Sequence, residues 1–147
     1  MKINTASAAI SFAKKLEEDS AKFYEDLSRK YIKDVDVLLS FAKENRKNIV
    51  QVERAYYEVI TDAIEACFAF NINPDDYAFK TELAEGASYS DVLEKAVEME
   101  EKIIKFYSDA AEQSQSLMAD VPRAFQMVAK KRDKRRAMLK SLLGKEA

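Results

Sequence analysis

The chain has 147 residues, with two glycines, two prolines, one cysteine and no histidine. This length and a 48% share of hydrophobic residues suit one compact domain. Two glycines cannot supply the turns of a many-stranded sheet, and Gly86 and Gly144 lie too far apart to form a glycine-rich phosphate or dinucleotide loop. Without histidine, imidazole-based catalysis and His-ligated zinc or iron sites are excluded. One cysteine excludes an internal disulfide framework and a thiolate metal cluster.

The formal net charge is -2 and the pI is near 5.4, unlike a generally basic nucleic-acid-binding protein. The charge is unevenly distributed, because residues 127–147 carry eight basic and two acidic residues, a local balance of +6. No apolar run approaches the roughly 20 residues that a membrane span requires, and residues 1–10 lack a continuous apolar signal core. We therefore expect a cytoplasmic protein without a membrane partner.

Apolar residues recur at helical spacing in four stretches, and none shows the strict alternation of a half-buried strand. The sequence therefore predicts an all-α protein. The first helix is predicted from about Thr5 to Tyr31 and the second from about Val35 to Phe70, with Asp34 as N-cap of the second. The predicted buried face of the first helix consists of Ile10, Ala13, Glu17, Ser20, Tyr24 and Leu27. That of the second consists of Leu38, Phe41, Ile49, Val52, Tyr56, Ala63 and Cys67.

An irregular segment, residues 71–89, separates the second and third helices. A connection of that length in a compact helical chain is predicted to cross over to the other end of the bundle, which makes the second and third helices parallel. The third helix is predicted to start after Ser90 as cap and to run to about Gln113. The fourth is predicted to start with Asp120 as cap and to end before Gly144. Short links make the helices within each pair antiparallel.

The two halves of the chain contain an internal repeat. Leu16–Tyr24 matches Met99–Tyr107, and Phe41–Lys47 matches Val128–Lys134. Each helical hairpin is therefore one copy of the same unit. Two copies related by a pseudo-twofold axis place equivalent positions of the four helices around a common centre.

The repeat carries a carboxylate and a phenol on each of two apolar faces. Glu17 and Tyr24 are seven residues apart, as are Glu100 and Tyr107, so each pair lies on one side of its helix. A carboxylate on a buried stripe is costly unless a metal, a cation or hydrogen-bond donors accompany it. The alternative is that both glutamates lie at the edge of the stripe and are solvated.

The repeated Glu-x6-Tyr segment, the helix lengths and the long crossover resemble the ferritin-like superfamily, and most closely the rubrerythrin-like di-iron carboxylate proteins. The resemblance covers nearly the whole chain and implies one ferritin-like domain over residues 1–147. In that family, a glutamate on each of helices one and three and a Glu-x-x-His motif on each of helices two and four hold two irons, which react with oxygen or peroxide. By position, Glu17 and Glu100 match the single glutamates.

This sequence departs from the family pattern at the other four ligand positions. The Glu-x-x-His positions fall on Asn45 and Asn48 in the second helix and on Arg132 and Arg135 in the fourth. Two carboxylates then face two guanidiniums, and no metal charge is needed for neutrality. A guanidinium fork suits both oxygens of a carboxylate, and asparagine amides supply further donors and acceptors. We therefore expect a cluster without metal or other cofactor, made of Glu17, Glu100, Arg132, Arg135, Asn45 and Asn48.

Two alternatives remain for these positions. The two arginines could belong to a solvated basic run that includes Lys130, Lys131, Lys134 and Arg136. Helical spacing favours inward-pointing arginines and outward-pointing lysines, because one stripe contains Val121, Phe125, Val128, Arg132, Arg135 and Leu139.

The second alternative is an all-oxygen magnesium or manganese site, in which Glu44 and Asp133 join Glu17 and Glu100. It requires a rotation of about 100° per helix, which would also displace the apolar stripe.

The tyrosines and the cysteine have structural interpretations. Tyr24 and Tyr107 are expected to pack within the bundle, with hydroxyls reaching a carboxylate on a neighbouring helix. Cys67 lies in the apolar run Ala66–Phe70, which disfavours the thiolate and favours core packing.

These features favour a binding or structural protein that is not an enzyme and forms a homo-oligomer, most simply a dimer. An exposed surface is expected at the end of the second helix, at Tyr57, Phe68 and Phe70. One alternative is a metal-dependent oxidoreductase that uses iron or another divalent ion on peroxide or oxygen. Another is binding of nucleic acid or another polyanion through Lys130–Arg136, although no aromatic residues interleave with that run.

Overall fold

The computed structural model describes residues 2–59, 70–115 and 120–146. Within them the chain forms four long helices and one short 3-10 helix, and no strand beyond an isolated bridge between Ile3 and Ile72. The helices are α1 (Ala6–Lys30), α2 (Val35–Val59), α4 (Tyr89–Gln113) and α5 (Asp120–Glu146), and the 3-10 helix is η1 (Pro74–Tyr77). The prediction of an all-α helical bundle is confirmed.

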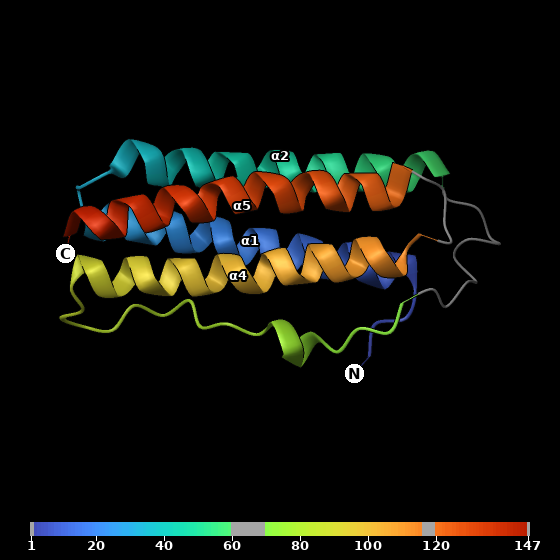
Figure 1. Ribbon diagram of the computed structural model, residues 1–147, viewed down its shortest axis with the longest axis horizontal. Coiled ribbons are helices and arrows are strands. Elements are labelled where there is room, and N and C mark those ends of the chain that lie inside the picture. Colours follow the sequence, from blue (N-terminus) through green and yellow to red (C-terminus); the bar gives the residue numbers. More distant parts are fainter. Residues whose placement is uncertain (1, 60–69, 116–119, 147) are drawn as a thin grey trace.

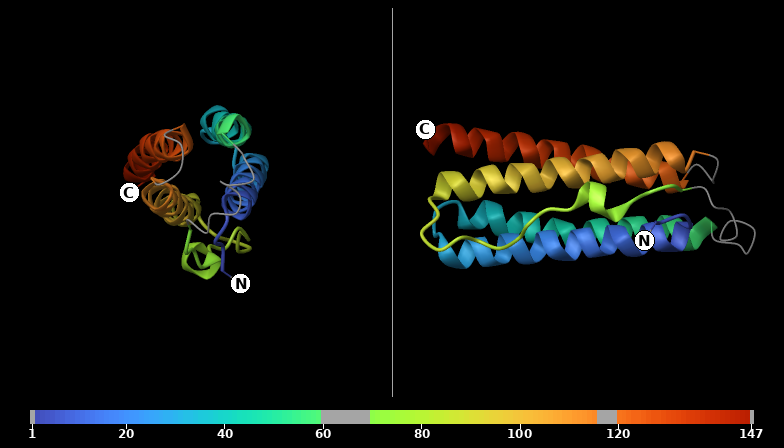
Figure 2. Two further views of the ribbon diagram at one scale, coloured as in Figure 1. Left: turned by 90° about the vertical axis from the view of Figure 1, so that its right-hand side faces the viewer. Right: turned by 90° about the horizontal axis from the view of Figure 1, so that it is seen from below.

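The four long helices lie side by side along the long axis of the molecule (Figure 1). α1 and α2 are antiparallel neighbours, as are α4 and α5, and α2 and α4 run in the same direction. Residues 70–88 return along the outside of the bundle, over the side formed by α1 and α4 (Figure 2). α2 and α5 lie on the opposite side.

The returning segment is anchored by aromatic side chains. Tyr77 of η1 and Phe12 of α1 both make edge contacts with Phe106 of α4, at ring-centroid distances of 5.6 and 5.1 Å. The Tyr77 hydroxyl donates to Asp109 Oδ2 at 2.6 Å. Burial and this hydrogen bond raise the pKa of Tyr77. The connection is thus packed onto the bundle.

The helix starts follow local capping chemistry, with two differences from the sequence prediction. Thr5 caps α1 through its hydroxyl, which accepts from the Ala8 amide. The N-cap of α4 is Ser88 rather than the predicted Ser90, so the helix starts two residues earlier than expected. Ser88 forms a capping box with Asp91. Asp34 precedes α2, but its carboxylate accepts from the Tyr89 hydroxyl of α4 at 2.9 Å, and its φ is 58°.

Of the four predicted helix ends, one lies outside the described residues and one is wrong. α2 is described as far as Val59, and the predicted continuation, with Ala63, Cys67 and Phe68, lies outside the described residues. α5 passes through Gly144 and ends at Glu146, so the prediction that glycine ends the helix is wrong. A helical Gly144 costs only about 1 kcal/mol relative to alanine, too little to stop an established helix.

The predicted core stripes are largely confirmed. All six predicted positions of the first helix are buried, and so are the six of the fourth, Arg132 and Arg135 included. In α2, Leu38, Phe41 and Val52 are buried, whereas Ile49 and Tyr56 are half-buried. Among the described helices, none is both long and apolar enough to cross a membrane.

Phe70 corrects one surface prediction. Its side chain is only 3% exposed, because residues 70–72 pair with the N-terminal segment and place the ring against Phe125 of α5. Ile3 and Ile72 exchange backbone hydrogen bonds of 2.7 and 3.0 Å. Tyr57, by contrast, is exposed as predicted.

Candidate functional site: a buried cluster of charged residues

Each long helix directs polar side chains into the centre of the bundle. Glu17 comes from α1, Asn45 and Asn48 from α2, Glu100 from α4, and Arg132 and Arg135 from α5. All six side chains are buried, and Arg132 and Arg135 are the largest of the fully buried ones. The prediction that both guanidiniums point inward is therefore confirmed, and the solvated-run alternative is wrong for these two residues.

Arg132 joins the two glutamates. Its Nη1 donates to both oxygens of Glu100, each at 2.8 Å, and its Nη2 donates to Glu17 Oε2. Ser20 Oγ and Asn45 Oδ1 accept further hydrogen bonds from Arg132, at 3.2 and 3.1 Å. The guanidinium bridges two carboxylates on different helices. The sequence instead predicts that both of its amino groups bind one carboxylate.

Arg135 extends the network toward α2. Its Nη1 donates to Asn45 Oδ1 at 2.7 Å and to Glu100 Oε1 at 3.3 Å. Its Nη2 donates to the carbonyl oxygen of Phe41 at 3.0 Å and to Glu44 Oε1 at 2.9 Å. The guanidinium carbon lies 4.7 Å from the centroid of the Phe41 ring, within cation–π range.

The tyrosine of each repeat hydrogen-bonds to the glutamate of the other repeat. Tyr24 of α1 donates to Glu100 Oε1 of α4 at 2.5 Å, and Tyr107 of α4 donates to Glu17 Oε1 of α1 at 3.0 Å. Burial, followed by the neighbouring carboxylate, raises the pKa of both hydroxyls well above the usual value. The predicted contact between each hydroxyl and a carboxylate of a neighbouring helix is confirmed.

The asparagines differ in their contacts. Asn45 accepts from both arginines, and its Nδ2 donates to the backbone oxygen of Glu17 at 3.3 Å. Neither polar atom of the Asn48 side chain has a hydrogen-bond partner among the described residues, although the side chain is fully buried. Asn45 is therefore part of the network and Asn48 lies beside it.

The electrostatics of the cluster are self-contained. Glu17 and Glu100 are balanced by Arg132 and Arg135, and Glu44 adds a carboxylate at the partly exposed edge. Burial alone would lower the pKa of Arg132, but Glu100 and Glu17 outweigh it and hold that pKa well above the usual value. The arginine is therefore a fixed cation at neutral pH.

The residues present do not fit a di-iron centre. Of the six equivalent positions, two are carboxylates, two are neutral amides and two are guanidiniums, which have no lone pair to donate to a metal. In the described part of the chain, no group of three His, Cys, Asp or Glu residues is arranged to hold a metal ion.

The all-oxygen alternative fails on the positions of its two extra acids. Glu44 is bound to Arg135, and Asp133 is exposed and accepts from Arg136 at 2.7 Å. Neither side chain therefore joins Glu17 and Glu100.

The remaining basic residues of α5 lie outside the cluster. Lys130 and Lys134 are exposed as predicted. Lys131 is half-buried and donates to Gln51 Oε1 of α2 at 2.9 Å. Helical spacing thus separates the two inward arginines from the outward lysines.

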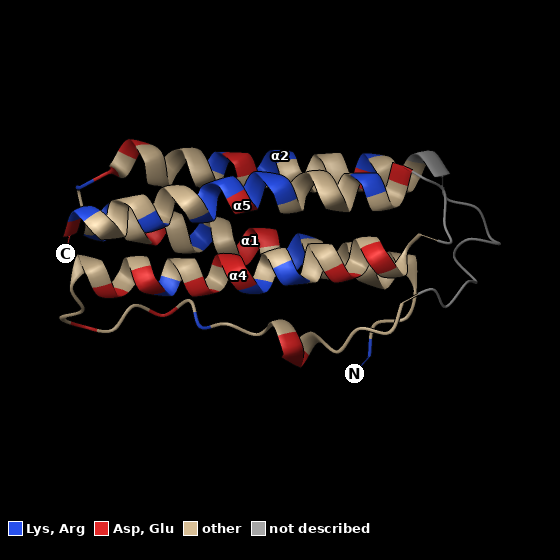
Figure 3. Cartoon of the chain, in the orientation of Figure 1, with Lys and Arg blue, Asp and Glu red and all other residues tan. Residues whose placement is uncertain are grey.

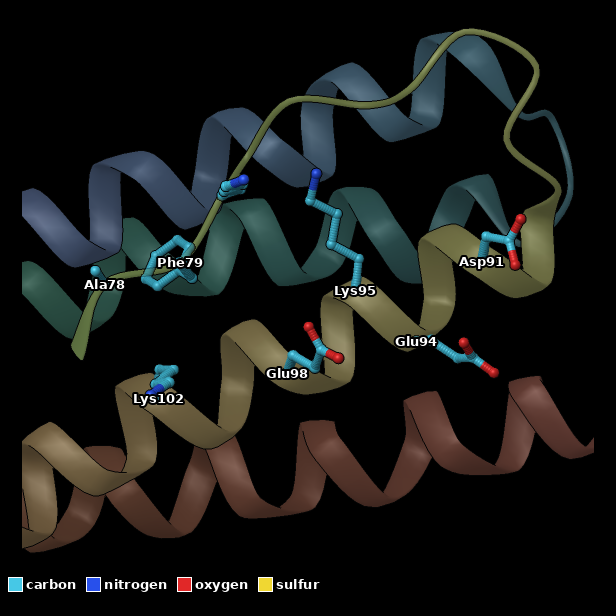
Figure 4. Close-up of a pocket in the computed structure, with 8 residues that line it drawn as sticks. Ala78, Phe79, Asp91, Glu94, Lys95, Glu98 and Lys102 are labelled. Carbon is cyan, nitrogen blue, oxygen red and sulfur yellow. The ribbon is translucent and has the colours of Figure 1, made fainter. Parts of the chain in front are cut away.

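The molecule also has a surface pocket of about 340 Å³ between residues 78–80 and α4 (Figure 4). Asp91, Glu94 and Glu98 line it together with Lys95 and Lys102, so its charges are mixed. None of its lining residues belongs to the buried cluster. A smaller groove of about 180 Å³ between α1 and α2 reaches Glu17 and Asn45 from the surface.

Two contacts of the cluster were not predicted from the sequence. Ser20 was assigned to the buried face of the first helix but not to the network, and Glu44 was considered only as a metal ligand. Ser20 lies three residues after Glu17, on the same helical face, which is the signal that could have included it.

The comparisons with known proteins are negative. No family model, no curated protein and no solved structure matches this chain.

Proposed function

We propose that this protein is a ferritin-like four-helix bundle in which a Glu/Arg/Asn cluster replaces the di-iron site, and that it acts as a non-catalytic binding or structural protein. The repeat, the antiparallel pairs α1/α2 and α4/α5 and the long connection along the bundle support the ferritin-like arrangement. The resemblance to rubrerythrin-like proteins rests on the same features.

The observation that carries this proposal is the position of Arg132 between Glu17 and Glu100. A metal centre at these positions would neutralise the two carboxylates with bound cations. Here one guanidinium contacts both carboxylates, and a second contacts Glu100. The positive charge is covalently part of the chain, so the centre has no requirement for metal and no open coordination position at which oxygen or peroxide would react.

A role without catalysis follows from the chemistry of the cluster. Arginine does not act as a base at neutral pH, and both tyrosine hydroxyls are held protonated by their surroundings. The fixed charges stabilise one arrangement of the four helices. We further propose a homodimer, for which the exposed Tyr57 at the described end of α2 offers contact area.

Metal analysis tests the proposal. Protein purified after growth in iron-supplemented medium is expected to hold no stoichiometric iron and to lack the absorption of an oxo-bridged iron pair. The matched control restores the family ligands with N45E, N48H, R132E and R135H and is expected to gain iron. Two irons per unaltered chain would contradict the loss of the centre, and a folded control that takes up no iron would contradict the positional match to the family.

A further inference from the structure

A groove of about 300 Å³ lies on the outer side of the bundle between α2 and α5. It is lined by Lys47, Val50 and Arg54 of α2 and by Asp120, Arg123 and Met127 of α5, among others. The connection of residues 70–88 packs over the opposite side, at α1 and α4 (Figure 2). Figure 2 shows no other described segment, within residues 2–59, 70–115 and 120–146, over the side of the bundle that α2 and α5 form.

The groove has a net positive charge, because its lining residues include Lys47, Arg54 and Arg123 but only one acidic residue, Asp120. Lys47 and Arg54 form no ion pair with any described residue. Arg123 Nη1 lies 3.9 Å from Asp120 Oδ1, but both side chains are exposed, and such a pair contributes little to stability in water. α5 carries further Lys and Arg residues along its length (Figure 3), and of these Lys130 and Lys134 are exposed. The face therefore carries several cations that form no ion pair with the described residues.

The same groove contains apolar side chains at the surface. Val50 is 54% exposed and Met127 is 46% exposed, and each lies beside the cations that line the groove. Gln51 Nε2 contacts the Met127 sulfur at 3.4 Å, which places the methionine at the junction of the two helices. Methionine adapts its shape to an incoming apolar surface and is common at binding sites.

This combination selects the partner. A groove between two antiparallel helices can accommodate a third helix. The apolar residues in the groove match an apolar stripe on that helix, and the flanking cations match acidic residues on either side of the stripe. We propose that the α2/α5 groove binds an acidic amphipathic helix of a partner protein. The inference rests on the proposed binding role and names the chemistry of its partner.

Other occupants fit less well. The same face of a second copy would bring Lys47, Arg54 and Arg123 against like charges. A nucleic acid would leave Val50 and Met127 without a matching surface, and the described residues that line the groove include no aromatic side chain for base stacking. A membrane surface is flat and would not fill the α2/α5 groove.

Binding to a designed probe tests this inference. The probe is a fluorescein-labelled helical peptide of leucine and glutamate, with the leucines on one face. The control peptide has the same composition but no leucine stripe. We expect fluorescence anisotropy to show at least about tenfold tighter binding of the patterned peptide, weakened by added salt. A 20-nucleotide RNA and phosphatidylserine vesicles are measured in parallel.

Matched variants locate the site. K47E with R123E reverses two charges in the groove and is expected to weaken peptide binding at least about tenfold. K22E with K140E makes the same change in charge at exposed positions outside the groove and is expected to leave binding nearly unchanged. M127S is expected to weaken the binding of the patterned peptide, because it removes apolar contact in the groove. Circular dichroism verifies that each variant is folded.

The outcomes are decisive in both directions. Equal binding of the two peptides, no binding of either, or tighter groove-dependent binding of the RNA or the vesicles would overturn the inference. The iron content of the same samples reports separately on the proposed function. Protein that fails to bind the peptide but remains free of iron overturns only the partner, whereas stoichiometric iron overturns the metal-free centre whatever the peptide does.

Discussion

Arg132 Nη1 lies 2.8 Å from each carboxylate oxygen of Glu100, in a part of the bundle where neither side chain has any exposed surface. The second amino group of the same guanidinium contacts Glu17 of α1. α5 is therefore tied to α4 and α1 through one side chain. Because the desolvation of these charges is compensated by contacts within the cluster, each member depends on the others.

Truncation of Arg132 is expected to be strongly destabilising. Arg132→Ala leaves Glu17 without its cation and leaves Glu100 with only Arg135, at 3.3 Å. We expect a loss of roughly 3 to 5 kcal/mol in the free energy of unfolding, measured with denaturant at pH 7. The matched control is Lys134→Ala, which removes an exposed cation two residues away and is expected to have little effect. A change below about 0.5 kcal/mol for Arg132→Ala would show that its side chain is solvated.

The pair formed by Arg132 and Glu100 is expected to behave as a unit. Arg132→Met leaves Glu100 with Arg135 as its only cation, and Glu100→Gln leaves Arg132 with Glu17 as its only buried carboxylate, whereas the double variant removes both charges of the pair. The double variant should be more stable than the sum of the single effects predicts, by roughly 1 to 3 kcal/mol. Strict additivity in the same unfolding measurements would mean that the two groups do not interact.

The two buried tyrosines predict a specific alkaline response. Because the pKa of each hydroxyl is raised above 10.0, the folded state keeps protons that the unfolded state loses above that pH. Their contribution to stability is therefore complete below pH 10 and declines as the pH rises above it.

The variant Y24F with Y107F isolates this contribution. At pH 7 it should be less stable than the unaltered protein by about 1.5 to 3 kcal/mol per hydroxyl, since each hydroxyl donates to a carboxylate. The difference should shrink between pH 10 and 11. A difference that grows over this interval in denaturant titrations would be inconsistent with protonated buried hydroxyls.

Asn45 and Asn48 provide a comparison within one helix. Asn45→Leu removes an acceptor shared by two guanidiniums and is expected to destabilise the fold by roughly 1 to 3 kcal/mol. Asn48→Leu replaces an amide that has no hydrogen-bond partner among the described residues, so it should be neutral or stabilising. Thermal unfolding of the two variants measures the contrast. Equal losses would indicate that both amides are equally engaged.

The sequence predicts the bundle and most of the cluster because helical periodicity determines which side chains share a face. Arg132 and Arg135 lie in register with Val128 and Leu139, and this register was sufficient to place them inside. The internal repeat related Glu17 to Glu100. Local features at the helix ends were less informative: Ser88 rather than Ser90 caps α4, and Gly144 continues α5.

Contacts between helices were harder to predict. Which oxygen accepts from which guanidinium depends on the relative rotation and shift of α1, α4 and α5, which periodicity does not specify. The burial of Phe70 depends on the pairing of residues 70–72 with the distant N-terminal segment, which has no local sequence signal.

The most direct test of the account is a crystal structure of protein produced with excess iron, with anomalous diffraction data collected at the iron edge. We expect guanidinium density for Arg132 between the carboxylates of Glu17 and Glu100, and no anomalous peak within coordination distance of either. An iron peak bound by these two glutamates, or density for the Arg132 side chain extending into solvent, would contradict the replacement of metal charge by arginine.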